Sequence, residues 1–211
     1  MRVALISACF GMKYPFDTNW VAPKLSLGVE LDVFKLDDKS MPLRSSMTPI
    51  LQAKIPKILG WKILPGYDYY IWVDASFSIP REDSVMWLLE KCIDVDAVFF
   101  HHNHRQTVEE EYKYLQAEGE KGNPYIVKRY KDEVFNPLWL ESSGLFACGC
   151  FCYHNNLKVQ RMMENWWAQV SQYHINDQLS FPYVWKDSGV VIRSLDENIM
   201  HNKYFKHHSH K

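Results

Sequence analysis

The sequence predicts an α/β fold in which a mostly parallel central sheet is flanked by helices. Short apolar segments of β-type composition alternate with helical segments along the chain, which is typical of three-layer α/β sandwiches. The segment Tyr69–Val73 contains only Tyr, Ile, Trp and Val, the composition of a strand buried on both faces. With 211 residues, the chain has the length of one domain with a sizeable core.

The expected strands are short apolar runs that end at polar or turn-forming residues. The first run ends at Phe10-Gly11, the second is followed by Asp37-Asp38, and Pro65-Gly66 forms a turn before the third. The fourth ends in a group of histidines, and the fifth is strongly apolar. In order along the chain, the predicted strands cover residues 3–9, 31–36, 69–73, 97–100, 144–153 and 190–194.

The expected helices lie between these strands. Apolar positions between residues 47 and 64 suit an irregular helix that is interrupted at Pro56, where a new helix could begin because proline is favoured in a first helical turn. A charged segment ends at Gly119, and Asn156 has the side chain of a helix N-cap. The predicted helices cover residues 47–64, 83–92, 107–118 and 157–173, in one domain over residues 1–211 with a histidine-rich tail from about residue 201.

The composition argues against several classes of function. The 24 Lys and Arg residues are balanced by 25 Asp and Glu residues, so the basic surface of a nucleic-acid-binding module is missing. No apolar run approaches the roughly 18 residues that span a bilayer, and the N-terminus does not resemble a secretory signal. We therefore expect a cytoplasmic protein with neither a nucleic-acid partner nor a membrane span.

The five cysteines are expected to be reduced and buried. Cys148, Cys150 and Cys152 alternate along a predicted strand, so their side chains should point to one face of the sheet. Their spacing lacks the two-residue gaps that are common in zinc thiolate sites, which argues against a zinc site.

Asp74 is the most informative candidate for a functional residue. It follows the most apolar predicted strand directly, and ligands of open α/β sheets bind beyond the carboxyl ends of such strands. A carboxylate in that position could bind a metal ion. The alternative is that Asp74 caps a turn or a helix.

Five stretches of the sequence, taken in order, resemble known glycosyltransferases. They are Ala8–Gly11, Tyr67–Ala75, His102–Arg105 with Glu109–Glu110, Gly144–Cys150 and Asp177–Phe181. The pattern resembles nucleotide-sugar glycosyltransferases of the GT-A fold, in particular the glycosyltransferase-like family that includes plant proteins of pectin and mucilage synthesis. It is also similar to an N-terminal glycosyltransferase domain of large DNA viruses of algae, which would place the protein in the host cytoplasm.

The resemblance implies a single Rossmann-like GT-A domain and a metal-dependent reaction. A hexose or deoxyhexose would pass from a nucleotide diphosphate donor, expected to be UDP-linked, to a hydroxyl of a glycan or glycoprotein acceptor. Mn²⁺ or Mg²⁺ would bind at an Asp-x-Asp signature, but here the second acid is Ser76, a weak neutral ligand. Asp74 would therefore supply most of the protein charge, and His201 of the tail is the first choice for a further ligand.

The remaining candidates are assigned to the donor and to the acceptor. Lysines suit the diphosphate, and acids beyond the second strand suit the base or ribose. Asp177 is the candidate general base that would activate the acceptor hydroxyl, although a capping or ion-paired Asp is the alternative. The expected donor contacts are Phe10, Lys13, Tyr14, Asp37, Asp38, Lys54, Lys57, Asp74, Ala75, Ser76, His104 and Arg105.

Two other functions remain open on the sequence alone. The replacement of an acid by Ser76 would suit an inactive domain that binds a nucleotide sugar or glycan without turnover. The histidines His101, His102 and His104 would suit a metal hydrolase, in which only His102 and His104 could converge from one strand. The His-Glu-x-x-His signature of zinc hydrolases is missing, which disfavours that class.

Overall fold

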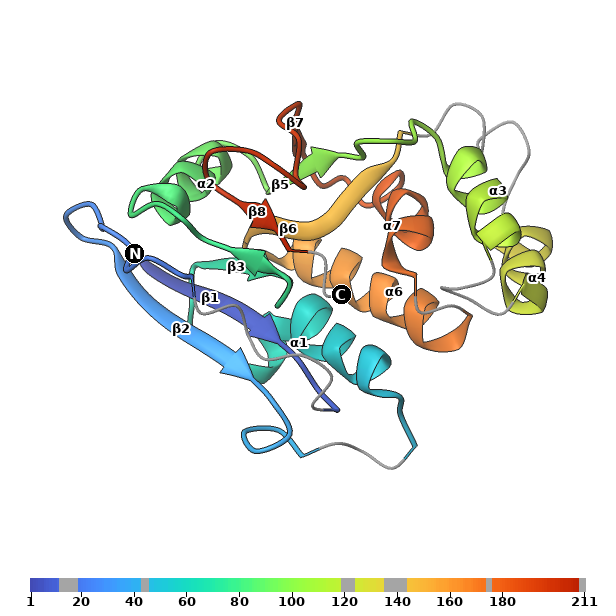
Figure 1. Cartoon of the computed structure of the whole chain (residues 1–211), viewed down its shortest axis with the longest axis horizontal. Helices are drawn as coiled ribbons and strands as arrows, with labels where there is room; N and C mark the ends of the chain where they lie inside the picture. The colour runs from blue at the N-terminus through green and yellow to red at the C-terminus, as the bar shows by residue number, and fades with distance from the viewer. Residues whose placement is uncertain (12–18, 43–45, 119–123, 135–143, 174–175, 209–211) are drawn as a thin grey trace.

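A mixed sheet of six strands forms the centre of the molecule, with helices on both faces (Figure 1). The computed structural model describes residues 1–11, 19–42, 46–118, 124–134, 144–173 and 176–208. The sheet has the strand order β2-β1-β3-β6-β5-β7, and β4 and β8 form a separate two-stranded sheet. The strands are β1 (Arg2–Ala8), β2 (Glu30–Leu36), β3 (Tyr69–Val73), β4 (Phe77–Ser78), β5 (Ala97–His101), β6 (Phe146–His154), β7 (Ile192–Leu195) and β8 (Lys206–His207).

Most neighbouring strands of the large sheet point the same way, as predicted. β1 is parallel to β2 and β3, and β5 is parallel to β7, whereas β6 is antiparallel to both of its neighbours. The carboxyl ends of β1 and β3 therefore lie at one edge of the sheet. In the pairing of β3 with β6, Val73 faces Cys150, which brings the first half of β6 to that edge.

The helices cover the sheet from two sides and from one end. α1, α6 and α7 pack on one face, around Ile58, Trp166 and Phe181, whereas α2 packs on the other face with the segment that carries Phe205. α3 and α4 pack against each other in a third apolar cluster (Figure 1). The helices are α1 (Pro49–Ile63), α2 (Ser84–Cys92), α3 (Val108–Glu118), α4 (Pro124–Val134), α6 (Leu157–Gln172) and α7 (Asp177–Trp185). Among the described residues, no helix has both the length and the apolar character needed to cross a membrane.

Helix α1 begins two residues after the predicted start at residue 47. Thr48 is its N-cap, since the side chain accepts a hydrogen bond from the Leu51 N–H, and Pro49 occupies the first turn, where a missing N–H costs little. Pro56 lies inside the helix rather than at a new start, so the expected interruption there is wrong. The helix instead departs from helical backbone angles at Leu59.

Helices α4 and α7 and strands β4 and β8 were not predicted from the sequence. β4 and β8 have two residues each, which is too short for an apolar pattern to be recognised. α7 lacks the one-sided apolar pattern by which a helix is recognised, because it is packed between α6 and α3 and has apolar residues on all of its sides. It also contains Pro182, which argues against a helix in the sequence. One sequence signal was present: Asn176 is its N-cap and accepts a hydrogen bond from the Gln178 N–H.

The cysteines of β6 do not share a face, so that prediction is wrong. Cys148 packs in the cluster beneath α1 and α6, whereas Cys150 and Cys152 pack in the cluster beneath α2. The reason is an irregularity in the pairing of β5 with β6, where Phe99 faces Phe151 but Phe100 faces Ala147. Such a bulge adds residues to one strand and breaks the alternation of its side chains. None of the five cysteines forms a disulfide, and four of them are buried as expected, whereas Cys9 is only partly buried.

Candidate functional site

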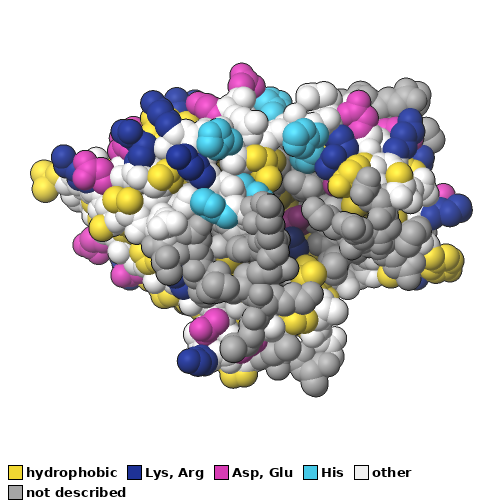
Figure 2. All heavy atoms as spheres, in the orientation of Figure 1, with side chains coloured by type: hydrophobic (Ala, Val, Ile, Leu, Met, Phe, Trp, Pro, Cys, Tyr) yellow, Lys and Arg dark blue, Asp and Glu magenta, His cyan; other side chains and the backbone are white. Residues whose placement is uncertain are grey.

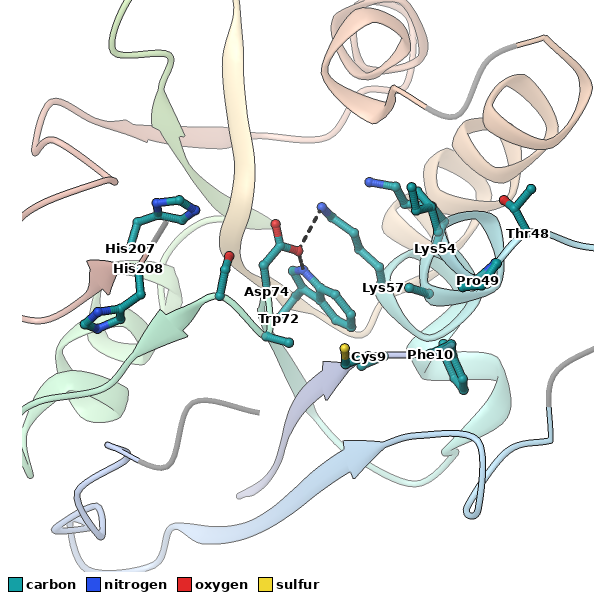
Figure 3. A pocket seen from close by; sticks show the side chains of 15 residues that line it. Cys9, Phe10, Thr48, Pro49, Lys54, Lys57, Trp72, Asp74, His207 and His208 are labelled. Carbon is teal, nitrogen blue, oxygen red and sulfur yellow. Dashed lines mark hydrogen bonds and ion pairs between the residues drawn. The ribbon is translucent and has the colours of Figure 1, made fainter. Parts of the chain in front are cut away.

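A cavity of about 770 Å³ lies beyond the carboxyl ends of β1 and β3, a volume typical of small-molecule sites (Figure 3). The first half of α1 forms one wall, and the start of the β4 segment together with β8 forms the opposite wall. Its described lining residues are Ala8, Cys9, Phe10, Thr48, Pro49, Ile50, Ala53, Lys54, Lys57, Trp72, Asp74, Ala75, Ser76, His207 and His208.

Asp74 lies where the sequence predicts it, at the end of β3 and in the cavity. Its N–H donates to the Gly149 carbonyl of β6 at 2.8 Å, which fixes the backbone against the sheet. Its Oδ1 accepts a hydrogen bond from the indole N–H of Trp72 at 2.6 Å and lies 3.3 Å from Lys57 Nζ. The carboxylate therefore caps no helix, and its side chain is held between an indole and an ammonium group.

Lys54 and Lys57 face the cavity from α1, where a spacing of three residues puts them on one side of the helix. Lys57 is buried, and its Nζ lies 2.5 Å from Asp177 Oδ2. Lys54 Nζ lies 2.8 Å from the same oxygen. Together with Asp74, these residues form a network of two positive and two negative charges. Figure 3 shows Lys54, Lys57 and Asp74, the three members that line the cavity.

The charges of this network stabilise one another. Burial alone would raise the pKa of the Asp177 carboxyl, but the two nearby lysines hold that pKa well below its usual value. Burial would lower the pKa of Lys57, but Asp177 and Asp74 raise it above its usual value. Both groups thus stay charged at neutral pH. Of the two interpretations of Asp177 from the sequence, the structure shows an ion-paired carboxylate, and Asp177 is not among the described residues that line the cavity.

The other predicted donor contacts divide into three groups. Phe10, Ala75 and Ser76 line the cavity, whereas Lys13 and Tyr14 lie outside the described residues. Asp37 and Asp38 do not line it, and their carboxylates bind backbone groups instead. Asp37 Oδ1 accepts hydrogen bonds from the N–H groups of Lys39 and Ser40, and Asp38 accepts one from the Gly11 N–H at 2.9 Å. Asp38 thus acts on the cavity only by holding the turn after β1.

His104 and Arg105 also lie away from the lining of the cavity. Arg105 forms an ion pair with the buried Glu111 of α3, and Glu111 Oε1 accepts a hydrogen bond from the Asn176 side chain at 3.2 Å. This connection to the residue before Asp177 was not foreseen, because Glu111 is one of three consecutive acids in the sequence and nothing marks it as the buried one.

The histidine cluster does not form a hydrolase centre in the described part of the chain. His102 Nδ1 accepts hydrogen bonds from the N–H groups of His104 and Arg105, so this ring closes the loop after β5. Histidine side chains do gather on the face shown in Figure 2. Among the described residues, however, no group of three or more His, Cys, Asp or Glu side chains is placed to hold a metal ion.

The tail brings histidines to the cavity, but His201 is not one of them. His201 is exposed and pairs with Lys206 in an isolated bridge, whereas His207 and His208 line the cavity. The His208 N–H donates to the Ser76 carbonyl at 2.8 Å, which joins the tail to the loop after Asp74. Because β8 has only two residues, the sequence could not show which histidines it would place there.

Without a bound donor, the cavity would supply only part of the ligand set of a divalent cation. The cavity offers one carboxylate, the Ser76 hydroxyl and the imidazoles of His207 and His208. Asp74 Oδ1 already contacts Trp72 and Lys57, so Oδ2 is the carboxylate oxygen left for a metal. Mn²⁺ and Mg²⁺ prefer several oxygen ligands, which a diphosphate could add. The residues therefore fit a cation that the protein shares with a phosphorylated ligand.

A family model of the TOD1/MUCI70 glycosyltransferase-like domain matches residues 47–209. The chain belongs to this family. The match extends from just before α1 to just beyond β8, so the lysines of α1, Asp74 and both cavity histidines of this TOD1/MUCI70 domain lie within it. The resemblance expected from the sequence motifs is thereby confirmed.

One solved structure shows the fold that this TOD1/MUCI70 domain shares. Mouse xyloside xylosyltransferase 1 has 10% identity and a TM-score of 0.53, with 93% of this chain and 86% of that chain covered. A glycosyltransferase involved in the glycosylation of the major capsid of PBCV-1 has 10% identity and a TM-score of 0.45. That alignment covers 79% of this chain and 66% of the viral protein, just under two thirds of its length. Comparison with curated proteins gives no match. The predicted GT-A-like fold is confirmed.

Gly11 supports the wall formed by Phe10 and Pro49, which gives a prediction for stability. Its φ of +75° favours glycine, and an added Cβ would lie 2.7 Å from Pro49 Cγ. Gly28 has a φ of +80° with nothing within 4 Å of an added Cβ, so it is a matched control. We expect Gly28→Ala to cost about 1 kcal/mol of unfolding free energy and Gly11→Ala about 1–3 kcal/mol more. Urea unfolding measures both, and equal costs would contradict the close contact with Pro49.

Proposed function

We propose that this protein transfers a sugar from a nucleoside diphosphate donor to a hydroxyl of a glycan or glycoprotein. The observation that carries the proposal is the cavity beyond β1 and β3, which is lined by one carboxylate, Asp74, and by two lysines, Lys54 and Lys57. Membership of a glycosyltransferase-like family supports the same reaction class. The proposed donor is a UDP-linked hexose or deoxyhexose, used with Mn²⁺ or Mg²⁺.

The two walls of the cavity suit different parts of such a donor. Lys54 and Lys57 would attract the diphosphate, because ammonium groups form short charge-assisted hydrogen bonds to phosphate oxygens. Phe10, Pro49 and Ile50 give an apolar surface on which a base could pack.

At the end of β3, Asp74 Oδ2 would hold a divalent cation beside the diphosphate together with a tail histidine of the cavity lining. Such a cation offsets the negative charge on the departing diphosphate when the bond to the sugar breaks. Asp74 would keep its place during the reaction, because the Trp72 N–H and Lys57 fix its other oxygen.

A thermal-shift screen of nucleoside diphosphate sugars tests the proposal. A ligand that binds only the folded protein raises the melting temperature by mass action. We expect at least one donor to raise the melting temperature with Mn²⁺ present, and to raise it less with EDTA. The proposal fails if no nucleotide sugar or nucleoside diphosphate shifts the melting temperature under either condition.

A second candidate function is binding of a nucleotide sugar without turnover. It is favoured by Ser76, which stands where the second acid of the signature is expected and leaves Asp74 as the one carboxylate in the described cavity lining. Release of nucleoside diphosphate from a bound donor separates the two functions. Slow release that Asp74→Asn abolishes would identify an enzyme, whereas donor binding with no release at any acceptor concentration would identify a binding domain.

A further inference from the structure

Asp177 is buried beside the cavity, but it contacts the cavity only through two other side chains. Its side chain is 8% exposed, and it is not among the described lining residues, whereas Lys54 and Lys57 are. Both ammonium groups contact the same atom, Oδ2, at 2.8 and 2.5 Å. A donor in the cavity would therefore meet the lysines before it met Asp177.

We infer that Asp177 is a positioning residue that holds Lys54 and Lys57 toward the donor diphosphate, and that it does not take the proton of the acceptor hydroxyl. The inference rests on the proposed function and assigns a role within the same site. It replaces the general base expected from the sequence with a counter-ion.

The first support is electrostatic. Two ammonium groups that approach one oxygen this closely repel each other, and the carboxylate between them offsets that repulsion. Lys57 is also buried, where an unpaired charge is costly. Without Asp177, the lysines would move apart or lose charge, and either change would weaken their contact with phosphate.

The second support is the rigidity of the backbone at Asp177. It is the first residue of α7, and its carbonyl accepts a hydrogen bond from the Trp166 indole N–H at 3.1 Å. The N-cap before it, Asn176, donates to Glu111, which Arg105 holds in an ion pair. This chain of polar contacts connects Arg105, in the loop after β5, to the residue before the counter-ion, although Arg105 does not line the cavity.

Asp177→Asn distinguishes positioning from proton transfer. If Asp177 acts as a counter-ion, Asp177→Asn should raise the donor KM and Kd by roughly 10- to 100-fold. The kcat at saturating donor should be largely kept, and the shape of its pH profile should not change. Asp177→Glu should recover part of the donor affinity. Loss of a general base predicts instead that kcat falls by about 10²–10⁴-fold and that the acid limb of its pH profile disappears. That second result would overturn the inference. Asp187→Asn, which changes an acid that is 85% exposed just beyond α7, is the matched control.

Lys54→Met gives a second test in case Asp177→Asn does not fold. Lys54 reaches the surface and leaves the Lys57–Asp177 pair in place. If Asp177 is a positioning residue, Lys54→Met should raise the donor KM and leave the acid limb of the kcat pH profile in place. If Asp177 is a general base, the loss of one neighbouring cation should shift that acid limb to higher pH, and this result would overturn the inference. Donor binding by the wild-type protein is measured first. If the wild-type protein binds no donor, the proposed function is refuted. If it binds donor normally but Asp177→Asn lowers kcat and loses the acid limb of the pH profile, only the positioning role is refuted.

Discussion

Lys57→Met is expected to destabilise the protein by about 3–5 kcal/mol and to abolish donor binding, because it removes one partner from a buried ion-pair network. Lys57 links Asp177 and Asp74, so its loss leaves Asp74 without its ammonium partner and Asp177 with Lys54 alone. Urea unfolding measures the first effect, and calorimetric titration with the donor measures the second.

Lys62→Met is the matched control, because Lys62 lies on the same helix and its side chain is 58% exposed. Its ion pair with Glu164 is a surface pair, so we expect a change of no more than about 1 kcal/mol. Lys57→Met combined with Asp177→Asn should cost less than the sum of the two single changes, because the residues are in contact. A Lys57→Met protein as stable as Lys62→Met would contradict the buried network.

Asp74→Asn is expected to lower turnover by about 10²–10³-fold with little effect on stability. The amide oxygen can still accept the hydrogen bond from the Trp72 indole, so the loop should keep its shape. The lost charge is the one that would hold a cation beside the diphosphate, and such electrostatic contributions to catalysis have this magnitude. Initial rates of nucleoside diphosphate release, measured at several Mn²⁺ concentrations, give the effect.

Asp68→Asn provides the comparison for that variant. Asp68 precedes β3 at the opposite end of the strand from Asp74, where its carboxylate accepts a hydrogen bond from the Arg2 N–H. We expect this change to leave turnover unaltered. Equal activity of Asp74→Asn and the wild-type protein would mean that the carboxylate at the end of β3 has no part in the reaction.

The sequence predicted the features that depend on local apolar patterns. The strands of the large sheet were recognisable as short runs rich in apolar residues, although the edge strand β2 has no buried residue. Asp74 was placed correctly because the carboxyl ends of parallel strands form a binding edge. Helices α1, α2, α3 and α6 were found within a few residues of their observed bounds. Within these four helices, the position of Pro56 in α1 was the one feature misinterpreted.

The sequence could not predict the contacts that bring distant charges together. Lys54 and Asp177 are 123 residues apart, and a lysine pattern on a helix does not show whether its partner is water or a buried acid. The same holds for Glu111 and Asn176, which are 65 residues apart. The placement of His207 and His208 depends on a two-residue strand, whose pairing with β4 is set by tertiary packing and not by local preference.

Calorimetric titration of UDP, GDP and ADP in the presence of Mn²⁺ tests most directly whether the cavity between α1 and β3 is a donor site. The measurement compares the wild-type protein with Lys54→Met and Asp74→Asn, which change lining residues on α1 and at the end of β3. The account predicts that at least one nucleoside diphosphate binds the wild-type protein and that each variant binds it at least roughly tenfold more weakly. No binding, or the same affinity in all three proteins, would contradict it.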